Sequence, residues 1–223
     1  MFVTQDSKLA YSPEISEVKK MIKGMKQKVV KDAIIAEAKK QFLEKGVNKT
    51  TLRSIARKLD MAIGNLYYYY KSKTDICLVI WHAYTKIFLA EYNAHLSIRG
   101  EKDSGLEGIR KYYSDLYEFC RQNPLYVDLI AHTMQEKQRY AVSDPEVEEL
   151  SRGIRDSIKT TLVALYERGI KDGSITAPVT NILYEVWSFN IAYIAIIMVR
   201  YNQIDDFIYE YYVNTYLERL ACQ

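Results

Sequence analysis

The chemistry of this sequence is concentrated in residues 63–73, IGNLYYYYKSK, where four consecutive tyrosines follow an asparagine and precede two lysines. A helix turns four successive residues through about 300°, so the side chains at positions 67–70 cannot all face one core. Leu66 and Tyr70 lie four residues apart on one face, which predicts that both are buried, together with Met61. The side chains expected to point outward, with Tyr67 at their edge, are those of Ile63, Asn65, Tyr68 and Tyr69.

Outward side chains of these types are suited to nucleic acid. Tyrosine hydroxyls can donate hydrogen bonds to phosphate oxygens. The Asn65 amide can pair with N6 and N7 of adenine, and Ile63 can contact a thymine methyl group. Gly64 has no side chain, so its backbone can approach a ligand closely. The same tyrosines could instead cover a hydrophobic protein partner, and the run alone leaves both interpretations open.

Lys73 and Thr51 favour a polyanion. Lys73 is expected at the first position of a long helix, which Ser72 and Asp75 open at capping-box spacing. The helix dipole disfavours a cation there. A bound phosphate would relieve the conflict, because the ammonium and the free N–H groups would both meet it. Thr51 offers a hydroxyl and free N–H groups in the same manner.

The distribution of charge is uneven along the chain. Residues 1–75 hold 16 Lys/Arg and 8 Asp/Glu, net +8, whereas residues 76–223 hold 15 and 20, net −5. A basic N-terminal third suits an end of the molecule that meets a polyanion. A solvated, lysine-rich helix surface would give the same numbers, so charge alone does not show whether this end binds a polyanion.

These side chains need a scaffold of short helices. Apolar residues recur at helical spacing from 26 to 45, and Gly46 is expected to end that helix. Thr50 is expected to cap a short helix, and residues 60–62 lead into a second one over 63–70. Two short helices joined by a tight turn and preceded by a packing helix predict a helix-turn-helix, whose second helix lies in the DNA major groove.

The stretch TTLRSIARKLDMAIGNLYYYYKSKTDI resembles the signature of the tetracycline-repressor (TetR) family of bacterial transcriptional regulators, and the resemblance covers about residues 28–76. The elements that carry it include Thr50-Thr51, Ile55-Ala56, Gly64, Leu66-Tyr67 and Lys71-Ser72-Lys73. The resemblance implies phosphate contacts by Thr51, Tyr67, Tyr69 and Lys73. It implies base contacts by Ile63, Asn65 and Tyr68, with Arg53 and Ala62 as further candidates.

Two residues depart from the family pattern. Asp60 stands in the turn where the family usually has Gly, and Asp tolerates a left-handed backbone only moderately. Ala62 stands where a Ser or Thr cap is usual, at a cost of about 1 kcal/mol. Both changes leave the recognition helix less well fixed.

The rest of the sequence predicts helices throughout. The expected fold is all-α, with nine or ten helices: a three-helix DNA-binding domain joined by a long helix to a helical ligand-binding and dimerisation domain. The expected domains are an N-terminal extension (1–25), the helix-turn-helix domain (26–72) and the C-terminal domain (73–223). The helices outside the helix-turn-helix are expected at 12–23, ended by Gly24, and at 73–97, 104–122, 124–139, 145–171, 178–201 and 204–221.

The last two helices predict a homodimer. Helix 204–221 has an apolar arc of roughly 240°, against the 100° or so that packing on one core requires. The helix before it is apolar nearly all round from 187 to 199. One side of these helices is therefore expected to face the core of its own subunit and the other side to face a second subunit. Alternatively, both helices are buried at the centre of a single subunit. The expected interface residues are Trp187, Ile194, Ile208, Tyr212 and Tyr216.

The resemblance also implies an effector cavity within the C-terminal domain. The aromatic content of that domain suggests a small apolar or planar effector. Each candidate could equally be a core residue: Tyr84, Phe88, Tyr113, Tyr117, His132, Met134 and Trp187.

Other classes of function find little support. The three histidines, His82, His95 and His132, do not have metal-ligand spacing, and His82 and His95 are expected to be ordinary surface or packing residues. No Ser/His/Asp or Cys/His arrangement occurs, so we expect no enzyme, metal or cofactor. Three widely spaced cysteines predict reduced thiols in the cytoplasm, and the apolar run 187–199 is too short to span a membrane.

The sequence therefore predicts a ligand-responsive, dimeric transcriptional repressor that binds operator DNA. The alternative is a dimeric helical protein-interaction module with a degenerate helix-turn-helix, which Asp60 and Ala62 would favour.

Overall fold

The structure is a computed structural model that describes residues 15–99, 103–137, 144–200 and 206–221. Within these residues it contains nine α-helices and no strand, which confirms the predicted all-α class. The helices are α1 (Ile15–Lys45), α2 (Leu52–Lys58), α3 (Ile63–Tyr69), α4 (Lys73–Arg99), α5 (Gly105–Gln122), α6 (Pro124–Lys137), α7 (Pro145–Asp172), α8 (Ile182–Arg200) and α9 (Asp206–Ala221).

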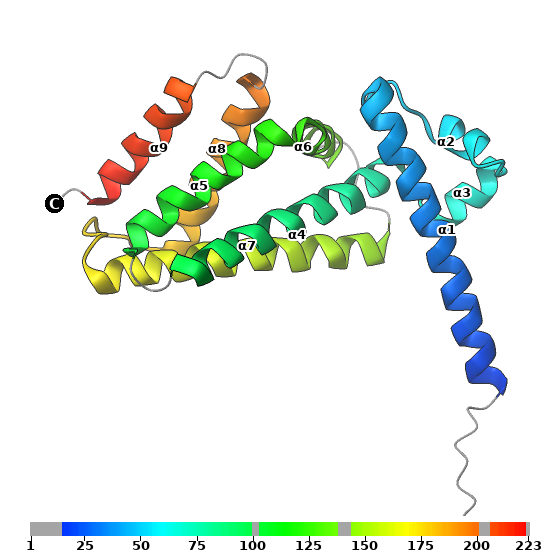
Figure 1. Cartoon of the computed structure of the whole chain (residues 1–223), viewed down its shortest axis with the longest axis horizontal. Helices are drawn as coiled ribbons and strands as arrows, with labels where there is room; N and C mark the ends of the chain where they lie inside the picture. Colours follow the sequence, from blue (N-terminus) through cyan, green and yellow to red (C-terminus); the bar gives the residue numbers. More distant parts are fainter. Residues whose placement is uncertain (1–14, 100–102, 138–143, 201–205, 222–223) are drawn as a thin grey trace, which may run out of the picture.

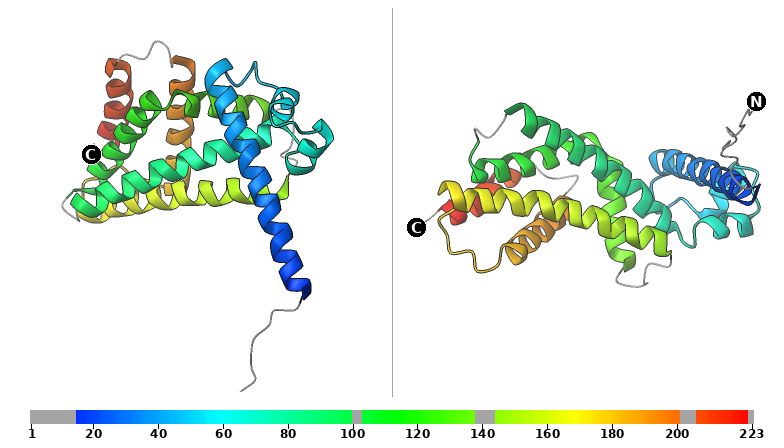
Figure 2. Two further views of the ribbon diagram at one scale, coloured as in Figure 1. Left: turned by 45° about the vertical axis from the view of Figure 1, so that its right-hand side comes forward. Right: turned by 90° about the horizontal axis from the view of Figure 1, so that it is seen from below.

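The helices form two groups joined by α4. Helices α1, α2 and α3 lie at one end of the molecule, and α5 to α9 form an elongated body at the other (Figure 1). The N-terminal half of α1 extends beyond both groups in Figure 1 and in the left view of Figure 2. At 1.5 Å per residue, the 31 residues of α1 span about 46 Å.

The first helix differs from the prediction, because α1 continues through Gly24 without a break. A Cβ at Gly24 would meet nothing within 4 Å, and the backbone there does not have a positive φ. Its cost of about 1 kcal/mol relative to Ala is offset by the strong helix formers Lys and Met on both sides. The predicted start at residue 12 lies outside the described residues.

Other helix ends agree with the sequence more closely. Gly46 and Gly173 end α1 and α7 with φ of +81° and +76°, as expected of C-terminal glycines.

The predicted start of α8 at residue 178 is wrong. Asn181 caps that helix instead, because its side-chain oxygen accepts a hydrogen bond from the Tyr184 N–H at 3.1 Å.

Two hydrophobic clusters hold the chain together, and α4 contributes to both. The N-terminal cluster joins α1, α2 and α3 to the first turns of α4 through Ile76 and Ile80, and also includes residues of α6. The body cluster takes Phe88 from the middle of α4. Trp81 and Tyr84, between these positions, pack against both clusters.

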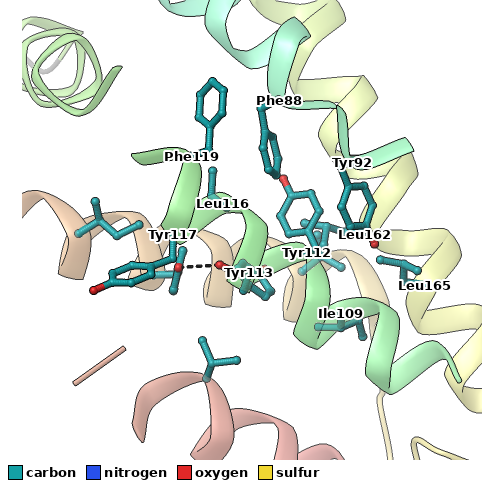
Figure 3. Packing of buried hydrophobic residues seen from close by; sticks show 14 of the residues in the cluster. Phe88, Tyr92, Ile109, Tyr112, Tyr113, Leu116, Tyr117, Phe119, Leu162 and Leu165 are labelled. Atoms are coloured by element: carbon teal, nitrogen blue, oxygen red, sulfur yellow. Dashed lines mark hydrogen bonds between the residues drawn. The ribbon is translucent and has the colours of Figure 1, made fainter. Parts of the chain in front are cut away.

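The body is tightly packed where α5 meets α7. A Cβ on Gly105 would lie 2.0 Å from the backbone nitrogen of Gly169, so only glycine permits this approach. Aromatic rings from α4 and α5 also pack against one another: Phe88 stacks on Tyr92, and the rings of both residues meet Tyr112 edge to face (Figure 3). Within the described residues, no helix is both long enough and apolar enough to cross a lipid bilayer.

One histidine and two cysteines are part of the packing: His82, Cys77 in the N-terminal cluster and Cys120 in the body cluster. His82 is buried at 1% exposure, which makes it a core residue and excludes the surface position. Cys77 and Cys120 are buried as free thiols, and burial raises the pKa of each to about 12. These two thiols therefore stay protonated at neutral pH.

Candidate nucleic-acid interface

The start of α2 is fixed by Thr51, whereas the sequence had suggested Thr50. The Thr51 side chain accepts a hydrogen bond from the Ser54 N–H at 3.1 Å, and the Ser54 hydroxyl accepts one from the Thr51 N–H at 3.3 Å. Thr50 is buried, and its hydroxyl donates to the carbonyls of Gln41 and Gly46. Thr51 therefore caps α2 and is exposed, while Thr50 ties the preceding turn to α1.

The turn between α2 and α3 has the two weaknesses expected from the sequence. Asp60 has φ of 51°, the one positive φ at a non-glycine position among the described residues. Ala62 is the N-cap of α3 and provides no side-chain hydrogen bond. The seven-residue α3 is thus held in place mainly by what it packs against.

Helix α3 is buried on the face predicted. Leu66 is fully buried, and Tyr70, at the C-cap, is 4% exposed. Burial, followed by the nearby carboxylates of Asp32 and Asp144, raises the pKa of Tyr70 to about 12. Asn65 is exposed on the opposite side, where it is available to a ligand.

The tyrosine run divides differently from the expectation. Tyr67 and Tyr68 are 46% and 60% exposed, so Tyr67 is fully part of the outward face. Tyr69 is half-buried and packs against the N-terminal cluster, as does Ile63. Tyr69 lies beside α1, which continues past the point where the sequence had suggested a break.

One hollow of about 560 Å³ brings together five of the nine predicted DNA-binding residues. Its walls come from the turn before α2, from α2, from α3 and from the start of α4. The lining residues are Asn48, Thr50, Thr51, Leu52, Arg53, Ile63, Tyr67 and Lys73. Asn48, Thr50 and Leu52 were not predicted to bind DNA, and only their place beside Thr51 in the sequence could have indicated them.

A second hollow, of about 870 Å³, holds Tyr68 and Tyr69 against α1. The Gln27 Nε2 group donates a hydrogen bond to the Tyr68 hydroxyl at 3.0 Å across it. The predicted DNA-binding residues are therefore divided between the two hollows. Ala62 and Asn65 line neither of them.

Lys73 is placed where predicted, at the first position of α4, but its ammonium group already has partners. Its Nζ donates to the Val47 carbonyl at 2.9 Å and to the Thr50 carbonyl at 3.3 Å. Two carbonyl dipoles therefore offset the unfavourable position at the helix N-terminus, and a phosphate is not needed for that purpose. Ser72 and Asp75 form the expected reciprocal cap, at 2.9 and 3.0 Å.

The residues predicted to line an effector cavity are only partly brought together. Phe88, Tyr113 and Tyr117 are buried in the body cluster, and Tyr84 packs against it. His132, Met134 and Trp187 lie outside that cluster; His132 and Trp187 are half-buried and Met134 is 36% exposed.

The residues predicted for a subunit interface differ in how far they are exposed. Tyr212 is exposed on α9, and Trp187 and Ile194 are half-buried on α8. Tyr216 is buried in its own subunit, where its ring stacks on Phe189 with centroids 3.5 Å apart. The side chain of Ile208 lies outside the described residues.

Comparison with known proteins agrees with this geometry. Residues 34–80 match the family model described as bacterial regulatory proteins, tetR family. An uncharacterized HTH-type transcriptional regulator of Bacillus subtilis, YuxN, is 29% identical over 124 residues, which are 56% of this chain and 40% of that protein. The chain thus matches less than half the length of this relative.

Solved structures share the fold. A tetR-family regulatory protein from Rhodococcus RHA1 has a TM-score of 0.62 and 20% identity, over 86% of this chain and 97% of that one. The TetR-family repressor FadR of Thermus thermophilus, solved with lauroyl-CoA, has a TM-score of 0.63 and 16% identity, over 86% and 96%. Residues 34–80 therefore match the tetR-family model, and the chain shares its all-helical fold with solved structures of proteins from that family.

The bonds of Lys73 predict a structural effect that can be measured without DNA. Lys73→Ala removes a charged donor from the Val47 and Thr50 carbonyls. Hydrogen bonds to charged groups contribute about 1.5–3 kcal/mol when buried, and this half-buried pair should contribute about 1 kcal/mol. Thermal unfolding should show a lower melting temperature than that of Lys49→Ala, which removes an exposed lysine nearby. Equal melting temperatures would contradict the structural role.

Proposed function

We propose that this chain is a TetR-family transcriptional repressor that responds to a ligand and binds a palindromic operator as a homodimer. The observation that carries the proposal is the hollow formed by Thr51, Arg53, Ile63, Tyr67 and Lys73 beside the exposed face of α3. Hydroxyl, guanidinium and ammonium groups from three successive helices converge there. Such groups bind phosphates and position a helix in the major groove.

Within this arrangement the exposed residues have two proposed roles, base recognition and phosphate binding. Asn65 is exposed near the start of α3, the part of a recognition helix that meets base edges. Its amide can pair with an adenine, which makes it the proposed reader of sequence. The hydroxyls of Thr51 and Tyr67 are the proposed phosphate contacts. They set the register of the helix without reading a base.

The proposed dimer uses α8 and α9. Five large apolar side chains on these helices are more than 40% exposed: Leu183, Tyr184, Ile191, Tyr211 and Tyr212. Exposed apolar side chains gathered on adjacent elements are typical of an interface, and tyrosine is enriched there. Tyr216 is not part of the proposed surface because it supports α9 from within the subunit.

The proposed effector is a largely apolar molecule bound in the body. The body cluster is rich in aromatic rings, and the related fold of Thermus thermophilus FadR was solved with lauroyl-CoA. Three buried polar atoms of α7 and α8, Ser151 Oγ, Tyr166 OH and Asn190 Oδ1, make no hydrogen bond with the described residues. Buried polar atoms usually have a partner, and a polar group of the effector would provide one.

The DNA-binding proposal is tested on genomic fragments that the purified protein retains. Asn65→Ala should weaken binding to the selected operator by roughly 1–3 kcal/mol per half-site and relax the preference at one symmetric pair of positions. Binding to random DNA should hardly change. The matched variant Tyr67→Phe removes one hydroxyl and keeps the ring, so it should weaken binding to every sequence alike. Fluorescence anisotropy at several salt concentrations measures both effects.

Two results would contradict this division. Equal loss on operator and random DNA would mean that Asn65 reads no base. If the wild-type protein retains no DNA, while Tyr68→Ala abolishes capture of a protein, the chain is the alternative, a protein-interaction module.

The dimer is tested by sedimentation. At micromolar concentration, the wild-type protein should sediment with about twice the 26.0 kDa mass of one chain. Ile191→Glu combined with Tyr212→Glu places two charges on the proposed surface and should give monomers. Ile170→Glu changes an equally exposed side chain on α7 and should remain dimeric. A wild-type monomer would refute the dimer.

The effector is tested with lauroyl-CoA, a free long-chain fatty acid and a planar aromatic compound as probes. A compound that binds the body should raise the melting temperature, because it binds the folded state alone. It should also lower the affinity for the operator. If no probe of the three classes has both effects, the proposal of an apolar effector is wrong.

A further inference from the structure

The N-terminal half of α1 is the part of the molecule that the proposed function does not use. We call residues 15–30 the α1 arm. The arm precedes residues 34–80, which match the family model. It projects beyond α2 and α3 as a continuous helix (Figures 1 and 2). Its 16 residues extend over about 24 Å.

The arm and the recognition helix share the larger hollow. The α3 side of this hollow is formed by Tyr68 and Tyr69, and the Gln27–Tyr68 hydrogen bond links the two helices. The arm side combines lysines with apolar side chains. The lining residues from α1 are Lys19, Ile22, Lys23, Met25, Lys26, Gln27, Val29 and Val30.

The charge of the arm is strongly positive. It contains five lysines and one glutamate, net +4. Lys19, Lys23 and Lys26 follow one another at i, i+4 and i+7, so they form one stripe along the helix. All three are exposed, and all three line the hollow. The other two, Lys20 and Lys28, are not among the lining residues.

We propose that the lysine stripe of the α1 arm binds the sugar-phosphate backbone of duplex DNA next to the half-site that α3 reads. The inference rests on the proposed DNA binding and extends it to a surface outside the helix-turn-helix. The hollow opens beside exposed Tyr68 of α3, so DNA held by α3 lies next to the stripe. Pairing of two arms is disfavoured, since each carries net +4.

The dimensions fit a backbone. From Lys19 to Lys26 the helix rises about 10 Å, and one DNA strand presents a phosphate about every 3.4 Å along its axis. Three lysines can therefore each meet a phosphate of one strand. The apolar side chains of Ile22 and Met25 then lie against the sugars, whose carbon atoms form the apolar part of the backbone.

The test compares two triple variants of the full-length protein on the same long operator duplex. Lys19→Ala/Lys23→Ala/Lys26→Ala removes the stripe. Lys20→Ala/Lys28→Ala/Lys40→Ala removes the same charge from exposed positions of α1 that do not line the hollow. Alanine preserves helix formation, and circular dichroism checks that both variants stay folded.

The stripe variant should reduce the slope of log K against log salt by roughly 0.9 for each lost phosphate contact, up to roughly 2.7 per subunit. Hydroxyl-radical footprinting should show loss of protected sugars beside each half-site, with the half-site itself still protected. The control variant should retain the wild-type footprint and most of the slope.

Three results would overturn the inference. If the two triple variants match in slope and footprint while Asn65→Ala still lowers operator affinity, the arm does not bind DNA and the proposed function stands. If Ile22→Glu/Met25→Glu changes the sedimenting mass and the stripe variant binds DNA normally, the hollow is an interface between copies. If the wild-type protein retains no DNA, both the inference and the proposed function fall.

Discussion

The structure depends on one rigid helix that belongs to two hydrophobic cores. Ile76 and Ile80 of α4 are buried with the helix-turn-helix, and Phe88 is buried with the body. Trp81 and Tyr84 contact both clusters, so no flexible joint separates them. Lys39 of α1 lies over the ring of Tyr84 at 4.5 Å and adds a contact between α1 and α4. Any change in the body that tilts α4 is therefore transmitted to the recognition helix.

The recognition helix in turn has little stability of its own. It has seven residues, an N-cap without a side-chain hydrogen bond, and a left-handed aspartate in the turn before it. Isolated helices of this length do not persist in water. Leu66 and Tyr70 anchor α3 in the N-terminal cluster, and the hydrogen bond from Gln27 to the Tyr68 hydroxyl links α3 to α1. Its orientation is thus set by tertiary contacts with α1, α2 and α4.

Local patterns predicted what depends on local geometry. The four-residue spacing of Leu66 and Tyr70 was enough to predict their burial, and the identities of Asp60 and Ala62 were enough to predict a strained turn and a missing cap. Contacts between distant residues were not accessible. Adjacent Thr50 and Thr51 are equally good caps, and the choice depends on carbonyls of Gln41 and Gly46. The carbonyl partner of Lys73, Val47, lies 26 residues away, and interpreting Gly24 as a break concealed the whole α1 arm.

The close contact of Gly105 with Gly169 makes α7 a lever. The helix is fixed there, backbone against backbone, and at its other end Glu146 pairs with Lys31 of α1. About 35 Å of helix separates the two points. A rotation of about 3° around the glycine contact would move the far end by roughly 2 Å, enough to open an exposed ion pair that contributes little stability. A small repacking in the body would thus break this link between α7 and α1, while the N-terminal cluster still holds α1 in place.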